Sequence, residues 1–195
     1  SLHDALPISA LRPVIYRVSV GLAGGLFFMG QFALFTYVRP FLEAVTGVSA
    51  SGLSLILLAI GVAGFIGTLG VSTLLNARFY QTLMTIPLLM ALIAGTLLLV
   101  GHHAWTVAVL LSLWGMLATA APTGWWTWIA RTLPDDAEAG GGLMVAVIQL
   151  SIALGSTTGG LVFDRLGWQS AFGLSGILLL AAVGMTLYTS RQMTQ

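Results

Sequence analysis

Two glutamine side chains are the clearest candidates for chemistry in this chain, because each one interrupts a long apolar stretch. Gln31 lies between Phe28 and Phe35 at i, i+3, i+7 spacing, which places an amide between two rings on one helix face. Such a face can stack on a flat ligand and hydrogen-bond its polar edge. Gln149 stands alone in a second apolar stretch. A buried amide without a partner costs on the order of a few kcal/mol. We therefore expect each glutamine to bind either a ligand or a neighbouring helix.

The elements that must carry these residues are membrane helices. The chain is 57% hydrophobic and only 7% charged, with a mean hydropathy of +0.99. A membrane-spanning helix needs about 20 apolar residues, and six stretches of about that length fill the sequence. The predicted fold is all-α, with spans at 14–38, 53–75, 82–100, 105–129, 143–163 and 171–189.

Glycines mark the helix faces at which we expect close packing. On the second span Gly61, Gly64, Gly67 and Gly70 recur every third residue, and on the fifth Gly155 and Gly159 form a GxxxG pair. Small residues let the backbones of membrane helices approach closely. These faces are interpreted as packing surfaces or, in a transporter, as surfaces that slide.

Proline and tryptophan suggest where spans end or bend. Arg39-Pro40 predicts the end of the first span, because proline disfavours helical geometry in the residue before it. Pro87 is expected to bend the third span, and Pro122 to loosen the fourth. Three tryptophans (Trp125, Trp126 and Trp128) close the fourth span and are typical of an interfacial aromatic belt.

Charged residues are confined to the ends of the spans and predict the orientation. One side would hold Arg12, Arg17, Arg78, Arg131 and Arg191, and the other Arg39 and Arg165. By the positive-inside rule both termini are expected in the cytoplasm. The net charge of +1 argues against a nucleic-acid partner, and the absence of cysteine removes thiolate metal sites. No cofactor or metal is predicted.

The first eight residues look foreign to the rest of the chain. Residues 1–8 (SLHDALPI) resemble the translated end of a sequencing adapter, and the first methionine is Met29, inside a span. We set them aside as a scar and take 9–195 as the six-helix bundle. On this reading the chain is a fragment whose gene continues upstream.

Four segments resemble one transporter family. They are 30–40 (GQFALFTYVRP), 124–131 (GWWTWIAR), 146–150 (AVIQL) and 159–167 (GGLVFDRLG). They are similar to the C-terminal half of the drug:proton antiporters of the major facilitator superfamily. Within that family the best match is to the purine ribonucleoside efflux pumps, with sugar and arabinose efflux proteins behind them.

The resemblance implies a twelve-helix fold in the bacterial inner membrane, of which this chain is the C-terminal six-helix half. It implies export of a small polar solute, with protons as the coupling ion and an N-terminal half as partner. The family's loop signature is degenerate here, where Gly70 is followed by Asn76-Ala77-Arg78, and this weakens a gating role for Arg78. Because no carboxylate lies within a span, the proton carrier is expected upstream of Ser9.

Other readings stay open at this point. The same family exports sugars and drugs, so the solute is not determined. Gly173-Leu174-Ser175-Gly176 is compatible with an intramembrane serine protease, but that chemistry needs a later histidine, and His3, His102 and His103 all precede Ser175. A complete six-helix protein that dimerises into a pore is a third possibility.

Overall fold

The chain folds into a bundle of long helices. The computed structural model describes residues 8–132 and 137–192, and these contain no strand. The long helices are α1 (Ile8–Phe35), α3 (Ala50–Val100), α4 (Ala104–Thr132), α5 (Ala137–Leu166) and α6 (Trp168–Gln192), with a short α2 (Val38–Phe41) and a π-helix η1 (Leu42–Thr46) after α1. Residues 1–7, which hold most of the suspected scar, lie outside the described residues, and Ile8 is the first residue of α1.

The number of long helices differs from the prediction. Among the described residues five helices are long and apolar enough to cross a membrane, where six were expected. The predicted spans 53–75 and 82–100 both fall within α3, which has 51 residues. No glycine or proline lies between Gly70 and Pro87, so neither residue type marks the break between these two spans, which lies at Arg78.

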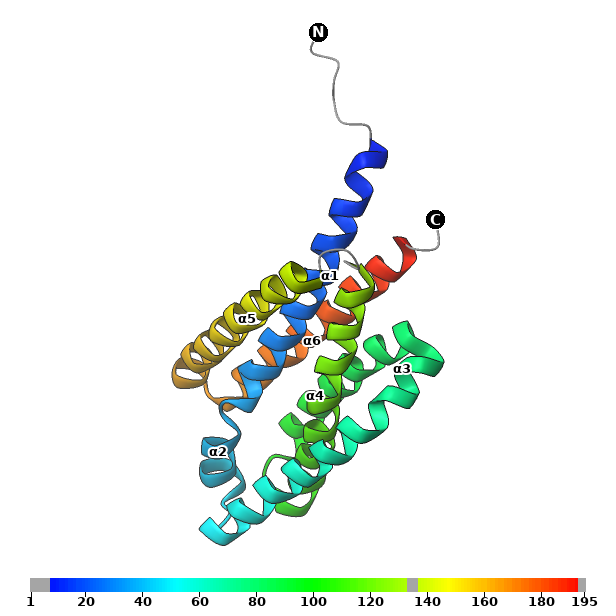
Figure 1. The fold of residues 1–195 in the computed structure, drawn as a ribbon. Coiled ribbons are helices and arrows are strands. Elements are labelled where there is room, and N and C mark those ends of the chain that lie inside the picture. The colour runs from blue at the N-terminus through cyan, green and yellow to red at the C-terminus, as the bar shows by residue number, and fades with distance from the viewer. Residues whose placement is uncertain (1–7, 133–136, 193–195) are drawn as a thin grey trace.

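Helix α3 is nevertheless not a straight rod. Arg78 has φ −148° and ψ 67°, which is not helical, and Figure 1 shows the arms 50–77 and 79–100 folded back on each other. Leu75 of the first arm and Leu83 of the second both approach Gly124 of α4. The hydroxyl of Thr82 donates to the carbonyls of Leu74 and Arg78, at 3.2 and 2.8 Å. Thr82 therefore satisfies backbone acceptors on both sides of the kink.

The prediction from Arg39-Pro40 was partly wrong. Helix α1 ends earlier, at Phe35, and helical structure resumes in α2, with Pro40 inside it. Proline is tolerated there because backbone N–H groups in the first turn of a helix have no intrahelical acceptor. Helices α3 and α4 also continue through Pro87 and Pro122.

Helix α1 lies at the centre of the packing and is held unevenly by its neighbours. It packs mainly against α5 and α6 and only lightly against α4. The Ser175 hydroxyl of α6 donates to the Gly30 carbonyl at 2.6 Å. Near the far end of α5, the Tyr37 hydroxyl donates to the Ser156 carbonyl at 2.6 Å. Direct hydrogen bonds therefore hold α1 to α6 at Gly30 and hold the segment just after α1 to α5 at Tyr37.

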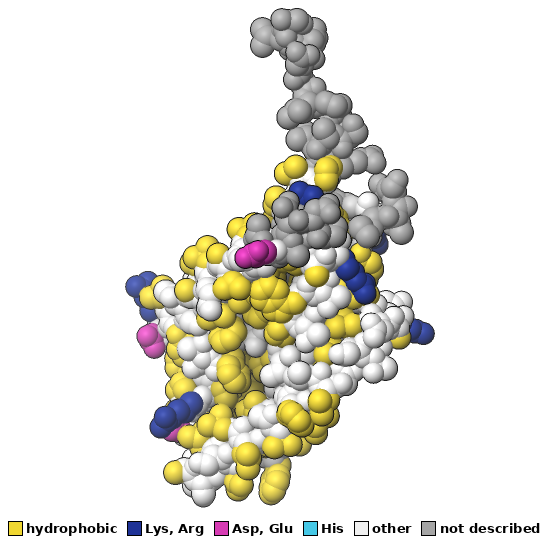
Figure 2. Space-filling view, viewed as in Figure 1, with side chains coloured by type: hydrophobic (Ala, Val, Ile, Leu, Met, Phe, Trp, Pro, Cys, Tyr) yellow, Lys and Arg dark blue, Asp and Glu magenta, His cyan; other side chains and the backbone are white. Residues whose placement is uncertain are grey.

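The surface agrees with a protein embedded in lipid. On the face in Figure 2, charged side chains gather at the two ends of the bundle, and hydrophobic or uncharged side chains cover the area between them. The exposed large hydrophobic residues include Leu58, Phe65 and Leu69 of the first arm of α3. Such wide apolar exposure is the rule only where lipid or another chain covers it.

Candidate functional site

Gln31 is a buried polar side chain with an unused acceptor. It is 8% exposed, and its Oε1 has no hydrogen-bond partner in the described part of the chain. Phe28, one turn earlier, is also buried and meets Phe27 edge to face, with ring centroids 5.3 Å apart. A buried unpaired carbonyl costs about 1–3 kcal/mol. A ligand donor placed at Gln31 would recover that free energy.

The face of α1 that carries Gln31 turns toward α4. Phe27 lies 6.1 Å from Trp125, measured between ring centroids, and a side chain at Gly24 would contact Trp125 and Met144. Gln31 follows Phe27 by four residues and therefore shares this face, about 6 Å further along the helix. One turn along α4 in the same direction is Ala121, which is buried and has no side-chain donor.

The other predicted binding residues are not brought to one point. Phe35 is half-buried and meets Phe32 edge to face, with centroids 6.4 Å apart. Gln149 is exposed on α5. It lies about 160° around that helix from Val147 and from Ser151, both of which face Gly25 of α1. The structure thus keeps Phe28 and Gln31 together on the buried face of α1 and leaves Gln149 apart from them.

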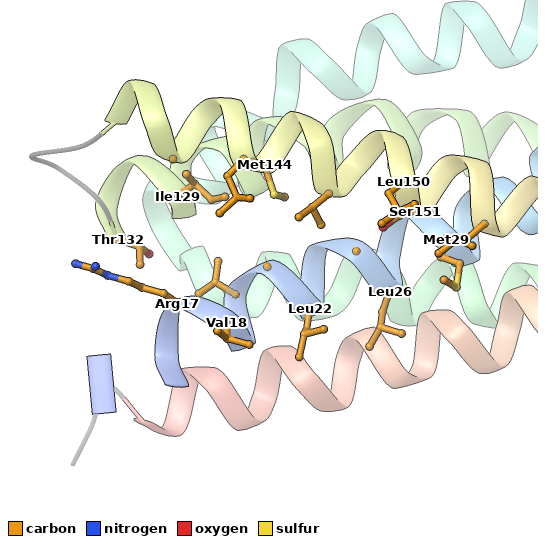
Figure 3. A pocket seen from close by; sticks show the side chains of 17 residues that line it. Arg17, Val18, Leu22, Leu26, Met29, Ile129, Thr132, Met144, Leu150 and Ser151 are labelled. Carbon is orange, nitrogen blue, oxygen red and sulfur yellow. The ribbon is translucent and has the colours of Figure 1, made fainter. Parts of the chain in front are cut away.

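A groove separates α1 from α5 on another side of α1. Its volume is 640 Å³, and it is lined by α1 from Arg17 to Met29, by α5 from Gly140 to Leu154, and by the end of α4. Figure 3 shows apolar side chains from α1 and α5 along its length, with Arg17 and Thr132 at one end. None of the four predicted binding residues lines it. The groove therefore excludes Gln31 itself, although Val20, about two turns before Phe27 on the same face of α1, lines it.

Two of the three tryptophans do not form an interfacial belt. Trp125 and Trp128 are each 1% exposed, and only Trp126 is open, at 39%. Trp125 and Trp128 are three residues apart and so share one face of α4. They stack with centroids 5.4 Å apart. The belt interpretation was wrong for this pair because these rings fill the bundle core.

Trp128 joins three helices. Its indole Nε1–H donates to the Tyr16 hydroxyl of α1 at 2.7 Å. Its ring meets Tyr80 and Phe79 of α3 edge to face, with centroids 5.6 and 6.4 Å apart. The Arg131 guanidinium lies 4.3 Å from the centre of the Phe79 ring, within the range of a cation–π interaction.

The sequence patterns did not identify Tyr16, Phe79 and Tyr80 as contacts of Trp128. The available signal was the spacing of Trp125 and Trp128 together with two aromatic residues directly after Arg78. Neither pattern reveals that the partners lie on different helices. Arg78 itself is exposed, and its Nη1 lies 3.5 Å from the Gln81 amide oxygen.

The predicted glycine faces have different surroundings. A side chain at Gly67 would collide with the Met116 carbonyl of α4, and side chains at Gly155 and Gly159 would collide with the backbone of α1. At Gly64 a methyl group would lie 3.0 Å from the Thr119 methyl of α4, which is a tight contact. A methyl group at Gly61 or Gly70 would meet nothing within 4 Å. Of the four predicted glycines on α3, Gly64 and Gly67 therefore lie on a face packed against α4, and Gly61 and Gly70 do not.

The protease alternative finds no support in the surroundings of Ser175. That hydroxyl is fully buried and donates to the Gly30 carbonyl. His102 lies in the loop before α4, where its Nδ1 is 3.0 Å from the Val45 carbonyl. Ser175 thus serves as a link between α6 and α1.

Comparison with known proteins finds transporters and one protein with a regulatory name. No protein-family model matches the chain. The chain is 63% identical over 170 residues (87% of its length) to a Pseudomonas aeruginosa PAO1 protein named transcription regulatory protein OpdE, of which it covers 42%. It is 43% identical over 153 residues (78% of its length) to the purine ribonucleoside efflux pump NepI of Salmonella enteritidis, of which it covers 38%. NepI of Salmonella typhimurium is 42% identical over the same length.

These relatives are much longer than the chain, which spans about two fifths of their length. The similarity to named efflux pumps agrees with the apolar helices of the described residues. Together they support a bacterial membrane protein related to efflux transporters.

Proposed function

We propose that the chain is the C-terminal six-helix half of a proton-coupled exporter of the major facilitator superfamily. Its solute would be small and polar, with purine ribonucleosides as the first candidate. The observation that carries the proposal is the unpaired Oε1 of Gln31, buried beside aromatic rings in a chain 43% identical to a nucleoside efflux pump. Sugars and drugs remain the alternative solutes.

In this proposal Gln31 and Phe28 recognise the solute together. A purine presents N–H donors at its edge and a flat π-face, which suit a carbonyl acceptor and a neighbouring ring. The hydrogen bond would be strong because the surroundings have a low dielectric constant. Phe35 and Gln149 would join the site only through movement of α1 and α5 or through residues of the longer protein.

Orientation and coupling follow from the charges. Counting arginines puts the end of the bundle with Arg17, Arg78 and Arg131 in the cytoplasm of the inner membrane, with both termini there. The described acids Glu43, Glu138 and Asp164 are all exposed. We therefore place the proton carrier in the N-terminal half and a supporting role in gating at Arg78 and the glycine faces.

The test is nucleoside transport by the full-length protein with Gln31→Ala and Gln149→Ala. We expect Gln31→Ala to raise KM for adenosine at least tenfold, because the variant removes the acceptor and leaves an N–H donor of the bound ligand without a hydrogen-bond partner. Gln169→Ala, which removes an exposed amide of α6, is the matched control. Unchanged KM in both Gln31→Ala and Gln149→Ala would refute the assignment of the site.

The 63% identity to a protein named as a transcription regulator favours a second candidate, an effect on gene expression. An exporter can alter transcription by lowering the internal concentration of a solute. If so, Gln31→Ala should weaken transport and reduce the change in transcript levels together. Loss of transport with unaltered transcript levels would separate the two roles.

A further inference from the structure

A continuous series of ring contacts crosses the lightly packed boundary between α1 and α4. Phe27 of α1 lies 6.1 Å from Trp125, Trp125 stacks on Trp128 at 5.4 Å, and Trp128 meets Tyr80 at 5.6 Å, all between centroids. The series starts one turn from Gln31 and ends at the α3 kink. It therefore connects the buried polar side chain to the break in α3.

One hydrogen bond closes this boundary at its arginine-rich end. Trp128 Nε1–H donates to the Tyr16 hydroxyl at 2.7 Å, and it is the one side-chain hydrogen bond between α1 and α4 recorded for the described residues. Elsewhere Gly30 of α1 accepts a hydrogen bond from Ser175 of α6, and Tyr37, two residues beyond the end of α1, donates one to Ser156 of α5. Of the boundaries that α1 forms with α4, α5 and α6, the one with α4 is the most lightly packed.

The α3 kink is tied to the α4 side of this boundary. Phe79 and Tyr80 follow the non-helical Arg78 directly and contact the Trp128 ring, while Arg131 of α4 covers Phe79. Movement of α4 away from α1 would therefore carry residues 78–80 with it.

We propose that the Trp128–Tyr16 pair is a latch that controls access to Gln31. When the latch is closed, α4 covers Gln31, and when it opens, α4 and the α3 kink move together and expose the Gln31 amide to solute. Trp128 is in this sense a positioning residue. The role of the latch in transport rests on the proposed function, but its opening can be measured without any solute.

The test uses a cysteine reporter in the full-length protein, in a background without other cysteines. This chain has none, and Ala121 is buried on α4 one turn from Trp125. The rate at which a small maleimide labels Ala121→Cys reports opening of the α1–α4 boundary. Tyr16→Phe and Trp128→Phe each remove the latch hydrogen bond and should raise the rate about fivefold, the effect of one net hydrogen bond.

Matched variants separate a latch from general loosening. Trp126→Phe changes the exposed ring of the same helix and should leave the labelling rate unchanged. The double variant Tyr16→Phe/Trp128→Phe should label no faster than Tyr16→Phe alone, since Tyr16→Phe already removes the hydrogen bond that Trp128→Phe removes, together with the contact of the Tyr16 hydroxyl with Tyr80. Unchanged rates in the single variants, or an additive rate in the double variant, would overturn the latch.

A parallel measurement distinguishes failure of the latch from failure of the proposed function. Adenosine transport by Tyr16→Phe should show a lower KM, because a larger fraction of the protein is open to solute. If labelling behaves as expected but the protein carries no adenosine, the latch stands and the proposed solute is wrong. If adenosine is carried and labelling is unchanged, the solute stands and the latch is wrong.

Discussion

One side of α1 has open space but few polar groups, and the other side is closed but carries an unpaired polar atom. Toward α5, a groove of 640 Å³ is open but is lined almost entirely by apolar side chains. Toward α4, the helix is closed, yet there Gln31 carries a buried oxygen without a partner in the described part of the chain. An apolar groove has nothing with which to orient a polar solute, whereas an unpaired buried acceptor gains free energy from one. The less accessible side is therefore the better candidate site.

We expect the largest loss of stability when a buried ring is removed from the closed side of α1, which faces α4. Phe27→Ala removes a fully buried ring and is expected to lower the free energy of unfolding by about 3–5 kcal/mol. Leu22→Ala removes a side chain that is 50% exposed on the groove side and should cost far less. Thermal unfolding in detergent compares the two. Equal losses would contradict the contrast between the faces.

The next effect concerns how closely α5 approaches α1. Gly155→Val would force a side chain into the Met29 backbone and should cost about 1–3 kcal/mol or more. Gly21→Val points into open space beside the groove and should change stability by less than about 1 kcal/mol. Expression and melting temperature of the full-length variants provide the measurement. A tolerated Gly155→Val would mean that α5 does not rest on α1.

A third change sharpens the role of Gln31. Gln31→Met keeps the size of the side chain and removes the unpaired oxygen, so the free energy of unfolding should rise by about 1 kcal/mol. Adenosine KM should rise at least tenfold in the same protein. Loss of stability in Gln31→Met would instead indicate that the amide holds the bundle together, which contradicts a binding role.

The smallest effect is expected in the groove. Ser151→Ala removes one of its few hydroxyls and should shift stability by less than about 0.5 kcal/mol, with no change in adenosine KM. A clear rise in KM would place the groove within the polar site and remove the distinction drawn between the two sides of α1.

Much of the architecture could be read from the residues. Apolar length and the position of charges predicted α1, α4, α5 and α6 to within a few residues at most boundaries. Pairs such as Phe28 and Gln31 share a face by helical periodicity alone. The predicted break between 75 and 82 coincides with the kink at Arg78. The prediction was wrong at Trp125 and Trp128, where rings expected at the membrane interface are buried.

Local sequence thus determined that this chain forms apolar helices and which residues share each face, because both follow from composition and from a period of 3.6 residues. Only the tertiary structure decided which helix each face meets. It buried Gln31 with no hydrogen-bond partner for its Oε1 among the described residues, turned Gln149 outward, and joined Trp128 to Tyr16 across more than a hundred residues of chain. The reason is that such contacts depend on how side chains from distant segments fill a shared space, and no local period records that arrangement.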